Sequence, residues 1–131
     1  MGFLSKYSPQ ILGVVRIVVG LLFLEHGLMK IVGFPAPMGH GSLPPMIMAA
    51  GIIELLGGAL LILGLFSRIA AFVCSGEMAF AYFLAHFPKG IYPAMNGGED
   101  AILFCFVFLY LCVAGPGAWS VDQMRRSAHR G

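Results

Sequence analysis

The chain has 131 residues, of which 59% are hydrophobic and only 11% are charged, and its mean hydropathy is +0.88. Soluble domains carry about 25% charged residues, so the composition excludes an ordinary soluble domain and indicates an integral membrane protein. The formal net charge of +2 is small, and the basic residues outside the apolar runs gather mostly in the C-terminal "MRRSAHRG", which argues against a nucleic-acid surface.

Four apolar segments follow one another along the chain, and each approaches the roughly 20 residues that a helix needs to cross the hydrocarbon core. The first begins after a single lysine and has no small-residue cleavage site behind it, so we expect an uncleaved helix rather than a signal peptide. Runs this long and this continuously apolar are typical of membrane helices, not of barrel strands. The predicted spans are about 10–33, 46–66, 68–87 and 97–115.

The breaks between these segments are rich in glycine and proline, which end helices and form turns. They read "GFPAPMGHGSLPP", "FSR" and "FPKGIYPAMNGG". Because short links make consecutive helices antiparallel, we predict an all-α fold, an integral membrane four-helix up-down-up-down bundle that forms a single domain over residues 1–131.

The basic residues predict the orientation of this bundle. Lys89, and Lys30 at a helix end, fall on one side of the predicted membrane. The excess of positive charge lies on the other side, which the positive-inside rule assigns to the cytoplasm; both termini and the "FSR" link are therefore expected there. The residues on this side are Lys6, Arg68, Arg125, Arg126 and Arg130.

Small residues mark one face of the second segment. Gly51, Glu54, Gly57 and Gly58 lie along one stripe at helical spacing. Small residues let a neighbouring backbone approach closely, which is how helices associate in lipid. We therefore expect Glu54 to face another helix and not the lipid.

Ionisable residues occur in all four segments, although a charged residue near the membrane centre costs about 2.5 to 3.5 kcal/mol to insert. A shared polar interior lowers this cost, and we expect Arg16 and Lys30 to pair there with some of the acids. His26 and Lys30 are four residues apart and share a helix face. The candidate polar pocket consists of Glu25, His26, Lys30, Glu54, Glu77, His86, Glu99 and Asp100.

The charges in these segments do not balance. Five carboxylates face only Arg16 and Lys30, which leaves an excess of three negative charges. Protons on the carboxyl groups, protonation of His26 or His86, or a bound cation would neutralise it. Alternatively, the buried groups only fix the helix register through hydrogen bonds. Glu99 could instead act only as a cap at the start of the fourth predicted helix.

Metal and thiol chemistry are weakly indicated. His26, Glu54 and Glu77 are weak metal candidates, because no ExxH or HExxH spacing accompanies them. Haem held by His26 and His86 is a further alternative. The three cysteines lie inside apolar runs and include no CxxC pair, so they give no sign of a disulfide framework. His40 and His129 have no partner that the sequence suggests and are expected to be solvated.

Three stretches together resemble the DoxX family of small bacterial membrane proteins, and the resemblance extends from about residue 10 to 118. They are "RIVVGLLFLEHGLMKIVGF", "IIELLGGALLILGLFSRIAA" and "NGGEDAILF". The resemblance implies a four-helix protein of the bacterial inner membrane. It also implies links to thiosulfate:quinone oxidoreduction, to resistance against quinone and thiol stress, and to oxidoreductase complexes with soluble partners. The polar signature of the family falls on His26, Lys30, Glu54, Gly57, Gly58, Arg68, Asn96, Glu99 and Asp100, which adds Asn96 to the candidate pocket.

The favoured hypothesis is a redox-associated inner-membrane protein that binds a quinone-like or other lipophilic small molecule in the polar pocket. It would support an oxidoreductase or oxidative-stress resistance, and a quinone is the one cofactor that we consider. Whether the chain is itself a subunit of a quinone-linked enzyme stays open. The alternatives are a small proton- or cation-coupled permease, which would need a homo-oligomer, and a structural membrane anchor for a soluble oxidoreductase.

Overall fold

The computed structural model describes residues 2–39, 41 and 43–130, and every regular element in these ranges is a helix. His40 lies outside the described residues. A π-helical turn (Tyr82–His86) and a 3-10 turn (Phe87–Lys89) extend α4 without a break. The α-helices are α1 (Gly2–Ser5), α2 (Ser8–Ile31), α3 (Pro45–Leu63), α4 (Ser67–Ala81), α5 (Pro93–Asn96), α6 (Glu99–Ala114) and α7 (Val121–Arg130).

Three helical stretches are long and apolar enough to cross a membrane: Ser8–Ile31, Pro45–Leu63 and Ser67–Lys89. They correspond to the first three predicted spans, so the chain is an all-α membrane protein with three candidate transmembrane helices. The second stretch ends three residues earlier than predicted, because Gly64 adopts a left-handed conformation with φ 70° and terminates α3.

The fourth predicted span, 97–115, is a shorter helix than expected. Helix α6 has 16 residues and a length of about 24 Å, which falls short of the roughly 20 residues that span the hydrocarbon core. Glycines limit it at both ends, since Gly97 and Gly115 have φ values of 77° and 92°. Such conformations do not continue a helix of L-residues.

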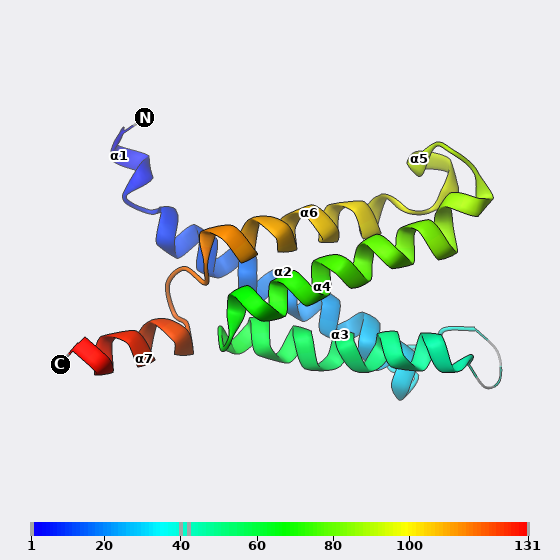
Figure 1. Cartoon of the computed structure of the whole chain (residues 1–131), viewed down its shortest axis with the longest axis horizontal. Helices are drawn as coiled ribbons and strands as arrows, with labels where there is room; N and C mark the ends of the chain where they lie inside the picture. Colours follow the sequence, from blue (N-terminus) through cyan, green and yellow to red (C-terminus); the bar gives the residue numbers. More distant parts are fainter. Residues whose placement is uncertain (1, 40, 42, 131) are drawn as a thin grey trace.

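The long helices lie side by side (Figure 1). Helix α2 packs along α3, α4 packs along α6, and α3 also contacts α4. Both termini lie at one end of the molecule, while α5 and the loop between α2 and α3 lie at the other end. The outer faces of these helices expose large apolar side chains, including Leu56, Phe72 and Phe106, which suits a lipid environment.

Glycines bring α2 and α3 into close contact. A Cβ atom added at Gly27 would lie 2.8 Å from the Leu55 nitrogen, and one added at Gly58 would lie 2.8 Å from the Leu24 nitrogen. These distances leave no room for a side chain at either position. Gly51 and Gly58 in α3 therefore face α2, whereas Gly57 faces α4, and these contacts fix the rotation of the helices.

We expect Gly58→Ala to destabilise the protein by about 1 to 3 kcal/mol, because the added methyl group meets backbone of α2 that cannot rotate away. The measurement is the unfolding midpoint of purified protein titrated with SDS in mixed micelles. Gly76→Ala is the matched control, since a Cβ at Gly76 of α4 meets nothing within 4 Å. Equal midpoints for the two variants would contradict the close contact.

The buried core joins α2, α3, α4 and α6. Phe23 packs against Phe104 and Phe108, with ring centroids 5.6 and 4.8 Å apart. Phe23 and Phe108 are fully buried, as are Leu61 and Leu111. This aromatic layer holds α6 against the pair formed by α2 and α3.

Arg16 is fully buried, and its partners are backbone carbonyl groups, not the acids that the sequence suggested. Its guanidinium donates hydrogen bonds to the Leu61 oxygen at 2.8 Å, to the Trp119 oxygen at 2.9 Å, and to the carbonyls of Pro116 and Ala118. Carbonyls at a helix end and in the following turns have no helical partner, and the five donors of a guanidinium can satisfy several of them at once.

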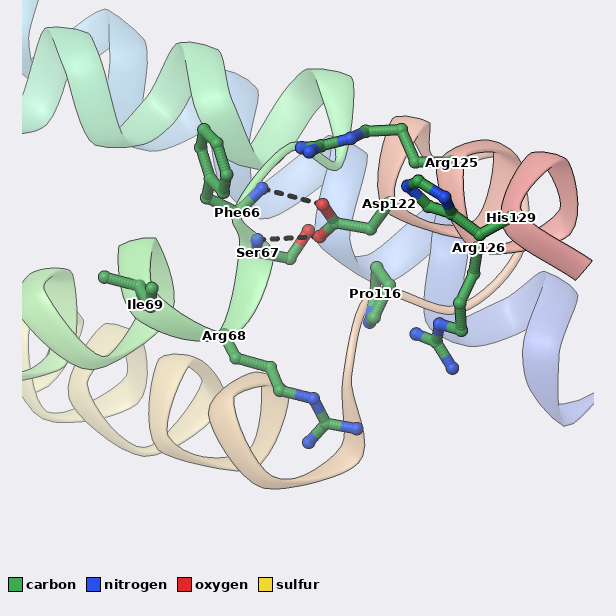
Figure 2. Close-up of a pocket in the computed structure, with 9 residues that line it drawn as sticks. All are labelled: Phe66, Ser67, Arg68, Ile69, Pro116, Asp122, Arg125, Arg126 and His129. Carbon is green, nitrogen blue, oxygen red and sulfur yellow. Dashed lines mark hydrogen bonds between the residues drawn. The ribbon is translucent and has the colours of Figure 1, made fainter.

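The C-terminal basic segment forms α7, which docks on the first turn of α4 (Figure 2). The carboxylate of Asp122 accepts hydrogen bonds from the backbone N–H groups of Phe66 and Ser67, both at 2.8 Å. These N–H groups belong to the start of α4 and have no partner within the helix. A residue distant in the sequence thus performs the task of a helix cap.

Candidate functional site

A buried ion pair joins α2 to α3. Lys30 Nζ lies 2.5 Å from Glu54 Oε2, with the Lys30 side chain 14% exposed and that of Glu54 fully buried. Lys30 comes from the last turn of α2, and Glu54 lies roughly 14 Å along α3 from its start. Gly51 permits the pairing, because a Cβ added there would lie 2.9 Å from the Lys30 Cβ.

A second acid, Glu77 of α4, lies beside this pair. Both of its carboxyl oxygens are buried without a hydrogen-bond partner among the described residues, and the same holds for Glu54 Oε1. Glu77 lies within hydrogen-bonding range of Glu54, so that a proton on one acid would join the two carboxyl groups, and it is within electrostatic range of Lys30. The acid cluster, defined as Lys30, Glu54 and Glu77, therefore contains two carboxyl groups and one ammonium group.

Cys74 adjoins the acid cluster and was not among the residues predicted from the sequence. It is 1% exposed and lies one helical turn before Glu77, within electrostatic range of both acids. Its sulfur packs directly against Gly57, where a Cβ atom would overlap it. The spacing of three residues between Cys74 and Glu77 could have indicated that they share a face of α4.

An apolar groove of about 490 Å³ lies between α3 and α4. Its wall is almost entirely apolar, and Gly57 and Cys74 line its inner end, next to the acid cluster. Exposed side chains such as Leu56 and Ile69 stand at its rim. A lipophilic molecule that enters this groove from the bilayer would come close to the buried acids. The lining residues are Ile53, Leu56, Gly57, Leu60, Phe66, Ile69, Ala70, Val73 and Cys74.

His26 and Glu25 have other surroundings. The His26 ring lies edge-on to Phe104 of α6, with centroids 5.6 Å apart, and its Nδ1 is 2.8 Å from the Leu22 oxygen, to which it donates a hydrogen bond. Glu25 is exposed on the outer face of α2. Lys30 shares the side of α2 that carries His26 but reaches α3 instead of α6.

His86 and Asn96 meet in a second polar group at the end of the molecule that holds α5. The Asn96 amide donates hydrogen bonds to the Tyr82 hydroxyl at 3.2 Å and to the Gly90 oxygen at 2.9 Å. The Oδ1 atom of Asn96 accepts a hydrogen bond from the Gly98 N–H at 2.8 Å, and His86 Nδ1 donates one to the backbone carbonyl oxygen of Asn96 at 3.2 Å. These bonds close the loop between α4 and α6.

Glu99 and Asp100 are exposed in the first turn of α6, where the helix dipole favours negative charge. The nine candidate residues thus occupy several places. The structure brings together Lys30, Glu54 and Glu77 in one group and His86 and Asn96 in another.

The weak metal candidates do not converge. Within residues 2–39, 41 and 43–130, no group of three or more His, Cys, Asp or Glu side chains is arranged to hold a metal ion. His26 turns toward α6, whereas Glu54 and Glu77 lie together between α2, α3 and α4. Cys74, Cys105 and Cys112 are all free thiols.

The apolar exterior, the three candidate spans and the buried ion pair define an integral membrane protein with a polar interior. Residues 11–87, more than half of the chain, match the profile of the DoxX family, and the chain belongs to this family.

Relatives support the membrane assignment. The chain is 48% identical over 129 residues to an uncharacterized protein of Haemophilus influenzae, covering 94% of this chain and 96% of that protein. It is 28% identical over 127 residues to the inner membrane protein YqjF of Escherichia coli (85% and 88% covered) and 29% identical over 126 residues to the inner membrane protein YphA of the same organism (88% and 90% covered). No solved structure matches the chain. The protein is thus an inner membrane protein that lies in the lipid bilayer with several candidate transmembrane helices.

Proposed function

We propose that this DoxX-family protein is a redox-associated membrane component that binds a quinone-like or other lipophilic molecule and exchanges a proton with it through Glu77. The observation that carries the proposal is the Glu77 carboxyl group, which is buried without a hydrogen-bond partner among the described residues, beside an acid that is already paired. A buried carboxylate without a counter-charge is costly, so Glu77 is the group in the cluster that takes up a proton.

Quinone chemistry fits such a group. Reduction of a quinone to a quinol consumes two electrons and two protons, and a buried acid that holds a proton can donate it to the ring oxygen. We assign the electrons to a soluble oxidoreductase partner and the replacement protons to water. The Lys30–Glu54 pair then keeps its own charges balanced while Glu77 changes its protonation state.

The apolar groove supports a route for the ligand. It opens on the exterior of the helices, and its inner end at Gly57 and Cys74 adjoins the acid cluster. An apolar ring with polar oxygens suits a site that is apolar along its walls and has a few polar groups at one end. We propose Lys30, Glu54 and Glu77 as the working residues, with His26 on the neighbouring face of α2 as an auxiliary group.

We further propose that α6 completes a four-helix transmembrane bundle, a single domain over residues 1–131, with both termini in the cytoplasm. Helix α6 lies along α4, and its flanking turns lengthen the segment beyond the helix itself. Lys6, Arg68 and Arg125 belong to the end of the molecule that holds the termini, whereas Lys89 lies near the opposite end. The positive-inside rule then assigns the end with the termini to the cytoplasm.

The test is survival of a strain without the chromosomal gene under quinone stress and thiol-oxidising stress, complemented with variants at equal abundance. We expect Glu77→Gln to lose protection, because the amide keeps the shape of the side chain but cannot donate the acid proton. Glu99→Gln is the matched control, since Glu99 is an exposed acid outside the cluster. Glu54→Gln and His26→Ala extend the series. Full protection by Glu77→Gln would overturn the proposal.

The excess carboxyl group favours a second candidate, a proton-coupled permease that works as a homo-oligomer. Proton flux in proteoliposomes discriminates the two functions. A permease carries protons with its solute in the absence of any electron donor, whereas the redox component does not.

A further inference from the structure

A basic pocket of about 390 Å³ lies at the end of the molecule that holds both termini (Figure 2). It is formed by the first turn of α4, by the residue Pro116 and by one face of α7. Figure 2 shows the side chains of Asp122 and Arg125 of α7 directed toward the start of α4. The lining residues are Phe66, Ser67, Arg68, Ile69, Pro116, Asp122, Arg125, Arg126 and His129.

The charges in the basic pocket are unbalanced. Three arginines face a single carboxylate, that of Asp122. Burial raises the pKa of Asp122. Hydrogen bonds from Ser67 and Phe66 and the nearby Arg125 lower this pKa by more than burial raises it, so it lies below the usual range. Asp122 is therefore ionised at neutral pH and is already bound by the start of α4. Among the described residues that line the pocket, two positive charges are left without a carboxylate.

Two of the three arginines, Arg68 and Arg125, are held in place by contacts that do not neutralise them. Arg68 Nη1 donates hydrogen bonds to the carbonyls of Cys112 and Val113, at 3.0 and 2.5 Å. The Arg125 guanidinium lies over the Phe66 ring, 5.4 Å from its centroid. Guanidinium groups fixed in this way retain free N–H donors with the geometry that phosphate oxygens require.

The basic pocket adjoins the apolar groove between α3 and α4. Phe66 and Ile69 line both cavities, so a cationic cavity lies next to an apolar one. A molecule with an anionic head and an apolar chain matches both the basic pocket and the apolar groove, whereas a free phosphate ion matches only the basic pocket.

We propose that the basic pocket binds the phosphate group of an anionic phospholipid, whose acyl chain passes over Phe66 and Ile69 and along α4 into the bilayer. Anionic lipids give the cytoplasmic leaflet a negative surface potential that attracts arginine clusters. The phosphate site contains no residue of the acid cluster, although the acyl chain would share the apolar groove with the lipophilic ligand proposed above. The bound lipid joins α7 to α4 and anchors the C-terminal helix at the membrane surface.

The test uses the full-length protein in detergent and measures lipid binding by native mass spectrometry with dioleoylphosphatidylglycerol and dioleoylphosphatidylcholine. We expect the parent to prefer phosphatidylglycerol, and Arg125→Gln/Arg126→Gln to weaken its binding by roughly tenfold or more. Lys6→Gln/Lys89→Gln is the matched control, because it removes two positive charges that do not line the pocket. This control is expected to bind phosphatidylglycerol like the parent.

Several outcomes would overturn the proposal: equal binding of the two lipids, or an equal loss in the control variant. Displacement of phosphatidylglycerol by inorganic phosphate alone would overturn the assignment to a lipid and leave a small-anion site. Should the double variant unfold, Arg126→Gln alone serves, since Arg126 is exposed. Glu77→Gln is expected to bind the lipid normally, so failure of the lipid site and failure of the redox function are separate results.

Discussion

Replacement of Lys30 by methionine is expected to lower the free energy of unfolding by about 3 to 5 kcal/mol, the cost of removing one partner of a buried ion pair. Lys30→Met leaves Glu54 and Glu77 together in the interior without a cation. The two acids then have to take up protons or separate, and either change weakens the contact of α2 with α3 and α4. The measurement is again SDS titration in mixed micelles.

The double variant Lys30→Met/Glu54→Leu is expected to recover most of this loss, because apolar residues of similar volume replace the pair and no uncompensated pair of acids is left. Glu77→Gln should cost little, since its oxygens make no hydrogen bond within the described residues. A double variant that is as unstable as Lys30→Met would show that packing of the lysine stem, not charge, determines the effect.

Replacement of Arg16 by glutamine is expected to lower the free energy of unfolding by about 3 kcal/mol or more. The variant leaves the carbonyls of Leu61, Pro116 and Trp119 without their donors, and each buried polar group without a partner costs about 1 to 3 kcal/mol. The segment after α6 should detach first, because Arg16 holds it against α2 and α3. Proteolysis near Gly117 in detergent measures this detachment.

Two variants check the origin of the Arg16 effect. Arg16→Lys keeps the charge but lacks the planar fork that reaches several carbonyls, so it is expected to be nearly as unstable as Arg16→Gln. Arg126→Gln removes an exposed arginine from α7 and should leave the midpoint of unfolding in the SDS titration unchanged. Parental stability of Arg16→Lys would mean that the positive charge alone is required, contrary to the hydrogen-bond geometry.

Local pattern predicted much of the fold but only part of the site. The stripe of Gly51, Gly57 and Gly58 predicted that Glu54 faces a neighbouring helix, and in the structure Glu54 is buried against α2. Glu25 is grouped with the cluster only as an ionisable residue in an apolar segment, a pattern that does not give its position around the helix axis. Glu25 is exposed instead.

Some contacts had no sequence signal of this kind. Arg16 was expected to pair with an acid, since a charged group in an apolar run suggests a charged partner. Its actual partners are backbone carbonyls, which every sequence contains and no pattern of side chains reveals. For Cys74 the sequence shows only a thiol inside an apolar run, because its contact with Gly57 depends on how α3 and α4 cross.

The sequence by itself determined that the chain lies in a membrane, where the four apolar helices begin and end to within a few residues, and which family it belongs to. These properties follow from the length of apolar runs, from glycine and proline at their ends, and from local motifs. Only the tertiary structure decided that Lys30 pairs with Glu54, that Glu77 lies without a partner among the described residues, and that Asp122 caps α4. The physical reason is that these contacts depend on helix rotation and register, which close packing at Gly27 and Gly58 sets between segments distant in the chain.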